Sequence, residues 1–209
     1  MPTLLHINTS PFPASSSYSR QLTDEFVRNW QESHPEGMVI ARDLAASRLQ
    51  PPTAEFIVAM HTPDASRTAS QHAALAVSDE LIAELKAADE YALGVSMHNF
   101  SIPSSLKLWI DQIARAGKTF SYENGKPEGL LRGKKATFLV ATGGVYEQGT
   151  PMAGMNFIEP YLRSVFGFLG VVDVTFIYAA GTMRERYGVD RATILQPAVE
   201  SIHAQFQTA

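Results

Sequence analysis

Hydrophobic residues along the chain alternate between short strand-like runs and longer stripes at helical spacing. The strand-like runs lie at residues 3–8, 38–42, 91–95, 136–141 and 171–179. The stripes, in which apolar residues recur three and four positions apart, lie at residues 22–30, 75–88, 103–116, 158–169 and 195–206. Spacing of this kind predicts amphipathic helices. Because strands and helices alternate, the pattern predicts an α/β fold in which a parallel sheet carries helices on both faces.

Local signals add detail to this pattern. Ser16 or Ser17 is suited to cap the first helix. Pro103 suits the first turn of the helix expected over residues 103–116, because the amide that proline lacks would be unpaired there. Residues 44–66 are rich in proline and are expected to be irregular. Asn124 and the glycine after it predict a tight turn between two short extended pieces.

Five strands in this alternation favour a three-layer α/β/α architecture with a five-stranded parallel sheet. The flavodoxin-like strand order 2-1-3-4-5 suits such a chain. No internal repeat and no linker-like composition divides the sequence, so residues 1–209 are expected to form a single domain.

Composition narrows the function classes. The 209 residues carry a formal net charge of -4 and contain no cysteine, which excludes disulfides, thiolate metal sites and a cysteine nucleophile. No basic run indicates nucleic-acid binding, and the six histidines have no metal-ligand spacing. The N-terminal residues lack the features of a signal peptide, and no apolar run reaches the ~20 residues that span a membrane. We therefore expect a cytoplasmic protein without a metal.

Small polar residues cluster after three of the strand-like runs, in segments named here the first, second and third loops. The first loop spans residues 10–19, the second 96–103 and the third 141–146. In an open parallel sheet, ligands bind beyond the carboxyl ends of the strands, where the strand order reverses. The three loops therefore predict one cleft, lined by backbone amides and short hydroxyls, that suits the phosphate and flat ring of a nucleotide-like cofactor.

The first loop leads into a predicted helix, and the amino end of a helix attracts phosphate through its unpaired amides. The loop contains neither the Gly-Lys-Ser/Thr ending of a Walker A motif nor a Gly-x-Gly-x-x-Gly fingerprint. A nucleoside triphosphate or a dinucleotide held by the usual Rossmann turn is therefore not expected. Taken alone, the loop is equally compatible with an ordinary serine-rich connection.

The other two loops suit the ring of such a cofactor. Asn99 can hydrogen-bond to the edge of a heterocycle, while Met97 and Phe100 can pack on its face or simply belong to the core. His98 is more compatible with a non-catalytic role. Adjacent glycines in the third loop would let the backbone approach a ligand closely, although they also suit a simple turn. No catalytic acid/base pair is evident, which agrees with hydride transfer by a cofactor that carries the chemistry itself.

A set of short motifs gives the chain a resemblance to a known family. They lie at residues 78–89, 97–103, 106–107, 111, 114–117, 119–120, 129–130, 133–135, 143–144, 161–162 and 168–170. The most specific are the Met-x-Asn-Phe of the second loop and the Ala-Arg-Ala-Gly-x-Thr-Phe that ends at Phe120. Over nearly its full length, the chain resembles the FMN-dependent NADH-azoreductases, also described as NADH:quinone oxidoreductases, of the flavodoxin-like superfamily.

The resemblance implies three groups of contacts to a bound FMN. The phosphate contacts would be Ser10, Ser17, Tyr18 and Ser19. The contacts to the ribityl chain and isoalloxazine would be Met97, His98, Asn99 and Phe100. The third loop would add Ala141, Thr142, Gly143 and Gly144. For substrates, the resemblance implies that Phe120 lies near the flavin across a dimer interface and that Tyr146 makes a polar contact.

The implied activity transfers a hydride from NADH or NADPH to FMN, and then to quinones or to aromatic azo compounds that are cleaved to amines. The implied kinetics are ping-pong, and a homodimer is expected. We expect the broad apolar stripes at residues 106–113 and 158–169 to contribute to its interface. A flavodoxin-type electron carrier, a non-catalytic nucleotide-binding module and a general FMN or nitro reductase stay open as alternatives.

Overall fold

The computed structural model describes residues 1–123 and 125–207, and the middle layer of this part of the chain is a five-stranded parallel sheet. Its strands are β1 (Thr3–Asn8), β2 (Met38–Asp43), β3 (Glu90–Ser96), β6 (Lys135–Ala141) and β7 (Asp173–Ala179). They lie in the order β2-β1-β3-β6-β7, so the flavodoxin-like order 2-1-3-4-5 is confirmed. Because every pair is parallel, all five carboxyl ends lie at one edge of the sheet.

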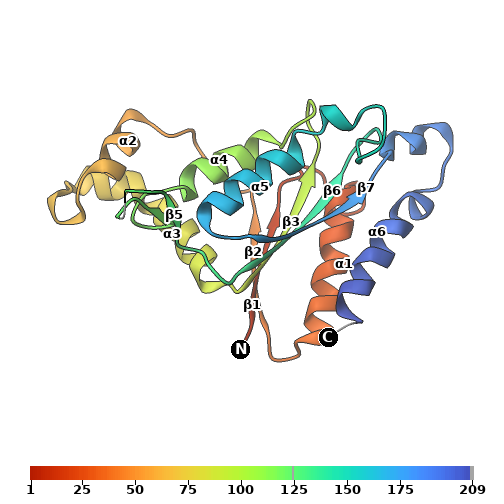
Figure 1. Ribbon diagram of the computed structural model, residues 1–209, viewed down its shortest axis with the longest axis horizontal. Coiled ribbons are helices and arrows are strands. Elements are labelled where there is room, and N and C mark those ends of the chain that lie inside the picture. The colour runs from red at the N-terminus through yellow and green to blue at the C-terminus, as the bar shows by residue number, and fades with distance from the viewer. Residues whose placement is uncertain (124, 208–209) are drawn as a thin grey trace.

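Helices cover both faces of the sheet (Figure 1). One face packs against α1 (Tyr18–Ser33) and α6 (Arg191–Phe206), and their core includes Leu22, Trp30 and Ile202. The other face packs against α3 (Ala69–Ala87), α4 (Ser104–Ile113) and α5 (Ile158–Leu169). Neighbouring strand residues enter opposite cores, as the two-residue period of a strand requires. Leu4 lies in the first core, for example, and Leu5 in the second.

The apolar stripes of α4 and α5 face inward. Leu106, Trp109 and Ile113 of α4 are buried in the core of this chain. Leu162 and Phe166 of α5 are buried there as well. These side chains pack within one chain, so a contact between two copies would use other side chains of the two helices, such as the exposed Phe168.

The segment at residues 44–66, expected to be irregular, contains a helix. Here α2 (Ala54–His61) is followed by the short 3-10 helix η1 (Asp64–Ser66). Thr53 caps α2, because its side chain accepts a hydrogen bond of 3.1 Å from the amide of Phe56. A small core of its own, made of Phe56, Ala59 and Leu75, stabilises the helix against α3.

Several boundaries also differ from the expectation. The helix α3 begins at Ala69 rather than Leu75, because Thr68 and Gln71 form a capping box before it. Pro103 occupies the N-cap position of α4 instead of its first turn. The helix α4 ends at Ile113, three residues before the expected end. Strand β7 likewise begins two residues later than predicted.

Two short strands, β4 (Phe120–Ser121) and β5 (Glu128–Gly129), pair antiparallel beside the carboxyl end of α5. They match the two extended pieces predicted around a tight turn, but Asn124 itself lies outside the described residues. The short 3-10 helices η2 (Ala153–Met155) and η3 (Thr182–Tyr187) follow β6 and β7. None of the helices found in the described ranges has the length and apolar character that crossing a bilayer demands.

Candidate functional site

The three loops follow β1, β3 and β6, which are neighbours in the sheet. The Oγ of Ser19, at the end of the first loop, lies 3.1 Å from the Oγ of Ser96 in the second. The amide of Met97 donates a 2.9 Å hydrogen bond to the carbonyl of Ala141 in the third. The structure therefore brings the predicted loops to one edge of the sheet, as the sequence pattern required.

The first loop ends at the amino terminus of α1. Ser17 is its N-cap, because its Oγ accepts a 3.3 Å hydrogen bond from the amide of Arg20. Helix geometry leaves the amides of Tyr18 and Ser19 without an intrahelical acceptor. The side chains of Ser10, Ser17 and Ser19 are almost fully buried. The loop thus offers free amides and oriented hydroxyls to an anion at a helix terminus.

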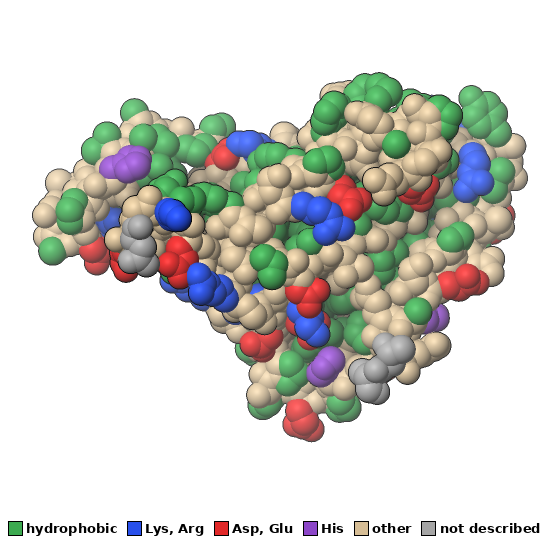
Figure 2. Space-filling view, in the orientation of Figure 1, with side chains coloured by type: hydrophobic (Ala, Val, Ile, Leu, Met, Phe, Trp, Pro, Cys, Tyr) green, Lys and Arg blue, Asp and Glu red, His purple; other side chains and the backbone are tan. Residues whose placement is uncertain are grey.

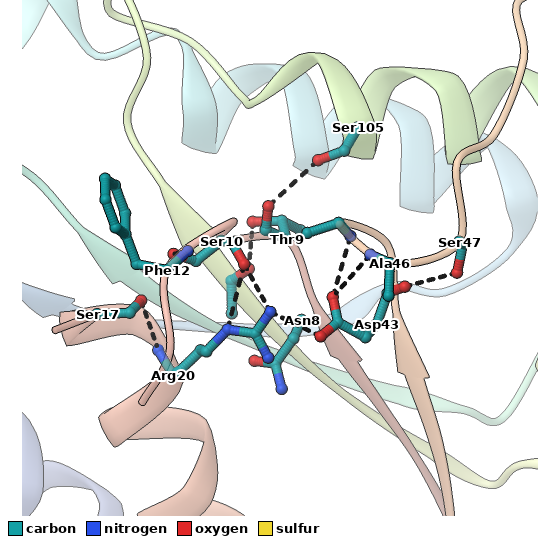
Figure 3. Close-up of polar contacts among 12 residues, drawn as sticks. Asn8, Thr9, Ser10, Phe12, Ser17, Arg20, Asp43, Ala46, Ser47 and Ser105 are labelled. Carbon is teal, nitrogen blue, oxygen red and sulfur yellow. Dashed lines mark hydrogen bonds and ion pairs between the residues drawn. The ribbon is translucent and has the colours of Figure 1, made fainter. Parts of the chain in front are cut away.

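An ion pair that the sequence analysis did not anticipate holds the first loop (Figure 3). The Nη2 of Arg20 donates to the carbonyl of Ser10 at 2.6 Å and to Oδ2 of Asp43 at 2.7 Å. From α4, the Oγ of Ser105 donates to the carbonyl of Thr9 at 3.3 Å. Elements far apart in the sequence therefore fix this backbone before any ligand binds. Arg20 and Asp43 lie 23 positions apart, and no local motif pairs them.

The side chain of Tyr18 turns away from this helix terminus. Its hydroxyl donates a 2.9 Å hydrogen bond to Oε2 of Glu185, and the guanidinium of Arg191 lies 4.3 Å from its ring centroid. Burial, followed by the hydrogen bond to Glu185, raises the pKa of the Tyr18 phenol. The hydroxyl of Tyr18 is therefore engaged elsewhere, and its backbone amide is the group that could bind a phosphate.

The second loop contains a turn of unusual backbone geometry. His98 and Ser101 exchange two backbone hydrogen bonds, of 2.9 and 3.0 Å. Between them, Asn99 and Phe100 have φ values of +49° and +70°. Both central residues of a type I′ turn require positive φ, which Asn tolerates but which strains a bulky residue such as Phe. Backbone strain of this kind concentrates at ligand-binding sites.

The second and third loops line an open cavity of about 250 Å³, called here the ring cavity. Met97, Asn99 and Phe100 line it from the second loop, and Gly143 and Tyr146 line it from the third. The rings of Phe100 and Tyr146 meet edge to face, with centroids 6.1 Å apart. The ring cavity thus combines apolar faces with an amide and a phenol, which suits a flat heterocycle. His98 belongs to the same turn but is not among its lining residues.

The third loop is held by the segment that follows β7. The amide of Met183 donates to the carbonyl of Gly143 at 3.1 Å, and the amide of Thr182 donates to that of Thr142 at 3.0 Å. A Cβ added at Gly143 would lie 3.1 Å from the Met183 side chain. At Gly144 it would lie 3.1 Å from the ring of Tyr146. A side chain at either glycine would therefore be tightly packed and would require the neighbouring side chain to shift. Ala141 and Thr142 themselves are buried.

Phe120 is not brought to the three loops within one chain. Its ring packs against those of Phe168 and Tyr122, with centroids 4.7 and 5.5 Å apart. The second loop precedes α4, whereas Phe120 follows it. A helix of this length spans about 15 Å, so Phe120 lies near the opposite end of α4 from the second loop.

The residues present fit FMN as the bound group. A helix terminus with free amides suits its phosphate, and the ring cavity suits a planar heterocycle next to a strained turn. Across residues 1–123 and 125–207, no three His, Asp or Glu side chains come close enough together to hold a metal ion.

Comparisons with known proteins agree with this geometry. A family described as having a flavodoxin-like fold matches residues 2–206. The chain is 54% identical to an FMN-dependent NADH:quinone oxidoreductase of Acidobacterium capsulatum over 203 residues, covering 97% of this chain and 98% of the relative. It is 44% identical to the FMN-dependent NADH:quinone oxidoreductase 3 of Burkholderia lata, again covering 97% of this chain and 98% of the relative.

Solved structures give the same picture. An azoreductase from Bacillus anthracis superposes with a TM-score of 0.89 at 27% identity, over the whole of both chains. An FMN-dependent NADH-azoreductase from the same species, solved in complex with FMN, has a TM-score of 0.86 at 25% identity and covers 99% of this chain and 98% of its own. This protein therefore belongs to the flavodoxin-like family of FMN-dependent NADH:quinone oxidoreductases.

Proposed function

We propose that this protein binds FMN and uses NADH to reduce quinones and aromatic azo compounds. The observation that carries the proposal is the meeting of a helix amino terminus and the ring cavity at one edge of the sheet. The names of the relatives support both the cofactor and the donor. Because NADH is an intracellular donor, the proposal implies a cytoplasmic enzyme.

In this proposal, the first loop holds the FMN phosphate. The amides of Tyr18 and Ser19 and the hydroxyls of Ser10 and Ser17 would donate to it. The Ser19 hydroxyl already lies within reach of its neighbours Ser17 and Ser96, at 3.3 and 3.1 Å, and it would orient the cluster. The partial positive charge at the start of α1 would stabilise the phosphate without a dedicated cation.

The second and third loops would hold the isoalloxazine. Once bound, FMN supplies the hydride chemistry, and the protein supplies orientation and a site that excludes water. Met97 and Phe100 would pack against the ring, and Asn99 would hydrogen-bond to its edge. The backbone of residues 141–144 would approach it closely, and His98 would contact it through the turn. No side chain of this chain is assigned a proton-transfer role.

Tyr146 and Phe100 would form the wall against which a flat acceptor stacks. We infer that Phe120 reaches this site from a second copy, so that the working unit is a homodimer. Tyr122 and Phe168, which pack on Phe120, are 57% and 39% exposed and form an apolar surface suited to such a contact. Light scattering should give a dimer, and a monomer would overturn this inference.

The experiment that tests the function is turnover by the purified, FMN-loaded protein. We expect oxidation of NADH that depends on an added benzoquinone, and separately on an azo compound, under nitrogen. Initial rates with two varied substrates should give the parallel lines of a ping-pong mechanism. A flavodoxin-type carrier would hold FMN but would not oxidise NADH unaided. Repeating the assay with NADPH decides the donor.

A further inference from the structure

A second cavity, called here the outer cavity, lies beyond Tyr146. Its volume is about 320 Å³, and Tyr146 lines both it and the ring cavity. The other lining residues that matter here are Gln148, Asn156, Glu159 and Arg163. No motif in the sequence pointed to any of these four. An acceptor stacked on a flavin in the ring cavity could reach past the Tyr146 ring into the outer cavity.

The base of the outer cavity is a connected polar network. The Nδ2 of Asn156 donates to the hydroxyl of Tyr178 at 3.1 Å, and that hydroxyl donates to Oε2 of Glu159 at 3.0 Å. The Oδ1 of Asn156 accepts from the amide of Ile158 at 3.1 Å, which ties the network to the start of α5. Burial raises the pKa of Tyr178, so this phenol stays a donor. A satisfied network holds the walls in one arrangement.

Arg163, in the wall of the outer cavity, has N–H donors that its contacts within the protein do not use. Its Nε and Nη2 reach Oε1 of Glu159 at 2.9 and 2.7 Å, and its Nη1 makes a long contact of 3.4 Å with the carbonyl of Val174. The guanidinium also stacks over the ring of Phe176 at 4.8 Å. A guanidinium carries five N–H donors, and the Arg163 side chain is 47% exposed. Two N–H groups therefore remain for a ligand.

The charges of Glu159 and Arg163 in the outer cavity cancel, and the amino end of α5 adds a partial positive charge. Glu159 lies in the first turn of α5, where the partial positive charge of the helix terminus offsets a carboxylate. The Tyr178 hydroxyl stabilises the same carboxylate by donating a hydrogen bond to it. The guanidinium of Arg163 is held in place by its ion pair with Glu159 and by its stacking on Phe176. A fixed guanidinium of this kind recognises a planar or tetrahedral anion through two parallel hydrogen bonds.

We propose that the outer cavity is a second acceptor subsite, in which Arg163 binds a sulfonate or carboxylate on one arm of an extended aromatic acceptor. The reducible part of that acceptor stacks on the isoalloxazine held in the ring cavity, on the near side of Tyr146. Arg163 is then a specificity-determining residue for two-ring anionic acceptors, and it has no part in reducing a single-ring quinone. This inference rests on the proposed function.

The test compares a phenylazobenzene sulfonate with the matching uncharged carboxamide, in wild type and in Arg163→Gln. We expect kcat/KM for the sulfonate to fall by about tenfold, because the variant loses a half-exposed pair of charge-assisted hydrogen bonds. Values for the carboxamide and for benzoquinone should stay unchanged. Arg163→Lys should restore only part of the loss, because lysine keeps the positive charge but cannot donate two parallel hydrogen bonds from a planar group.

Arg132→Gln is the matched control. Arg132 is also exposed and also pairs with a glutamate four positions away, Glu128, but it lies outside both cavities. Arg132→Gln should leave kcat/KM unchanged for the sulfonate, the carboxamide and benzoquinone. Equal losses in the Arg132 and Arg163 variants, or equal losses on charged and uncharged acceptors, would overturn the subsite.

Calorimetric binding of the same two azo compounds to FMN-loaded protein needs no turnover. The sulfonate should bind wild type about tenfold more tightly than it binds Arg163→Gln, and added salt should reduce the difference. If the wild type reduces both compounds but calorimetry finds no preference for the anion, the subsite fails and the proposed function stands. If no acceptor is reduced, the function fails, and calorimetry still decides the subsite.

Discussion

The first and second loops border the same cleft but are held in opposite ways. The first is buried at its two ends, where Arg20, itself paired with Asp43, holds the carbonyl of Ser10 and Ser105 holds that of Thr9 just before the loop. The second is a strained turn whose Phe100 ring is partly exposed at a positive φ. Preorganised polar groups suit a ligand part that never changes, such as a phosphate. A strained, apolar turn suits the isoalloxazine, the part on which NADH and the acceptor replace each other.

The largest effect should come from removing the support of the first loop. Arg20→Ala deletes hydrogen bonds from a charged donor to Ser10 and Asp43, each worth about 1.5–3 kcal/mol. We expect FMN to bind about tenfold to a hundredfold more weakly, measured by the quenching of flavin fluorescence. Arg28→Ala removes an exposed ion pair in the same helix and should have no such effect. Equal FMN affinity in the Arg20 variant and wild type would mean that the loop does not need this support.

Asn99 in the second loop should give a smaller change. Asn99→Ala removes the amide from the ring cavity and places Ala at a positive φ. The retention of FMN should fall by about fivefold, the value of one ordinary hydrogen bond. Asn99→Gly also removes the amide, but glycine adopts a positive φ without strain. Comparing the two variants therefore separates the role of the side-chain amide from that of the turn. Unchanged flavin content and turnover in both variants would refute the contact.

The strain at Phe100 can be measured without a ligand. Gly is normally less stable than Ala in ordered backbone, but at a φ of +70° the preference should reverse. We expect Phe100→Gly to be more stable than Phe100→Ala by about 0.5–1 kcal/mol in the free energy of unfolding by urea. If Ala proves the more stable of the two, the turn is not strained.

His6 should give the smallest effect, and it depends on pH. Burial lowers the pKa of His6 below its ordinary 6.5, and its Nε2 lies 3.1 Å from Nδ2 of Asn8, next to the first loop. Below the ordinary value the unfolded chain binds a proton that the folded chain resists, so stability is lost as the pH falls. Urea unfolding at about pH 7.5 and about pH 5.5 should show a smaller loss in His6→Gln than in wild type. The exposed His72, changed in the same way, is the control.

Much of the fold was predictable because its signals are local. Periodicity located the five strands and the apolar faces of their helices. The start of α3 was missed because residues 69–74 lack large apolar side chains, although the capping box at Thr68 and Gln71 was present in the sequence. The helix α2 was missed because it is short, lies between prolines and packs only on a small separate core.

The site was predictable as a set of loops but not in its detail. The ends of β1, β3 and β6 had to meet because parallel strands share one edge. The pairing of Arg20 with Asp43 and the stacking of Arg163 on Phe176 depend on tertiary contacts that no local pattern encodes. The positive φ of Phe100 runs against its intrinsic preference, so only the folded structure reveals it.

In the proposed function, the three loops together hold one FMN that NADH can reduce. The most direct measurement is the visible absorption spectrum of the FMN-loaded protein under nitrogen, before and after NADH is added. We expect a flavin spectrum that bleaches with NADH and returns when a quinone is added. Protein that retains no flavin after incubation with FMN, or a bound flavin that neither NADH nor NADPH bleaches, would contradict the proposed function.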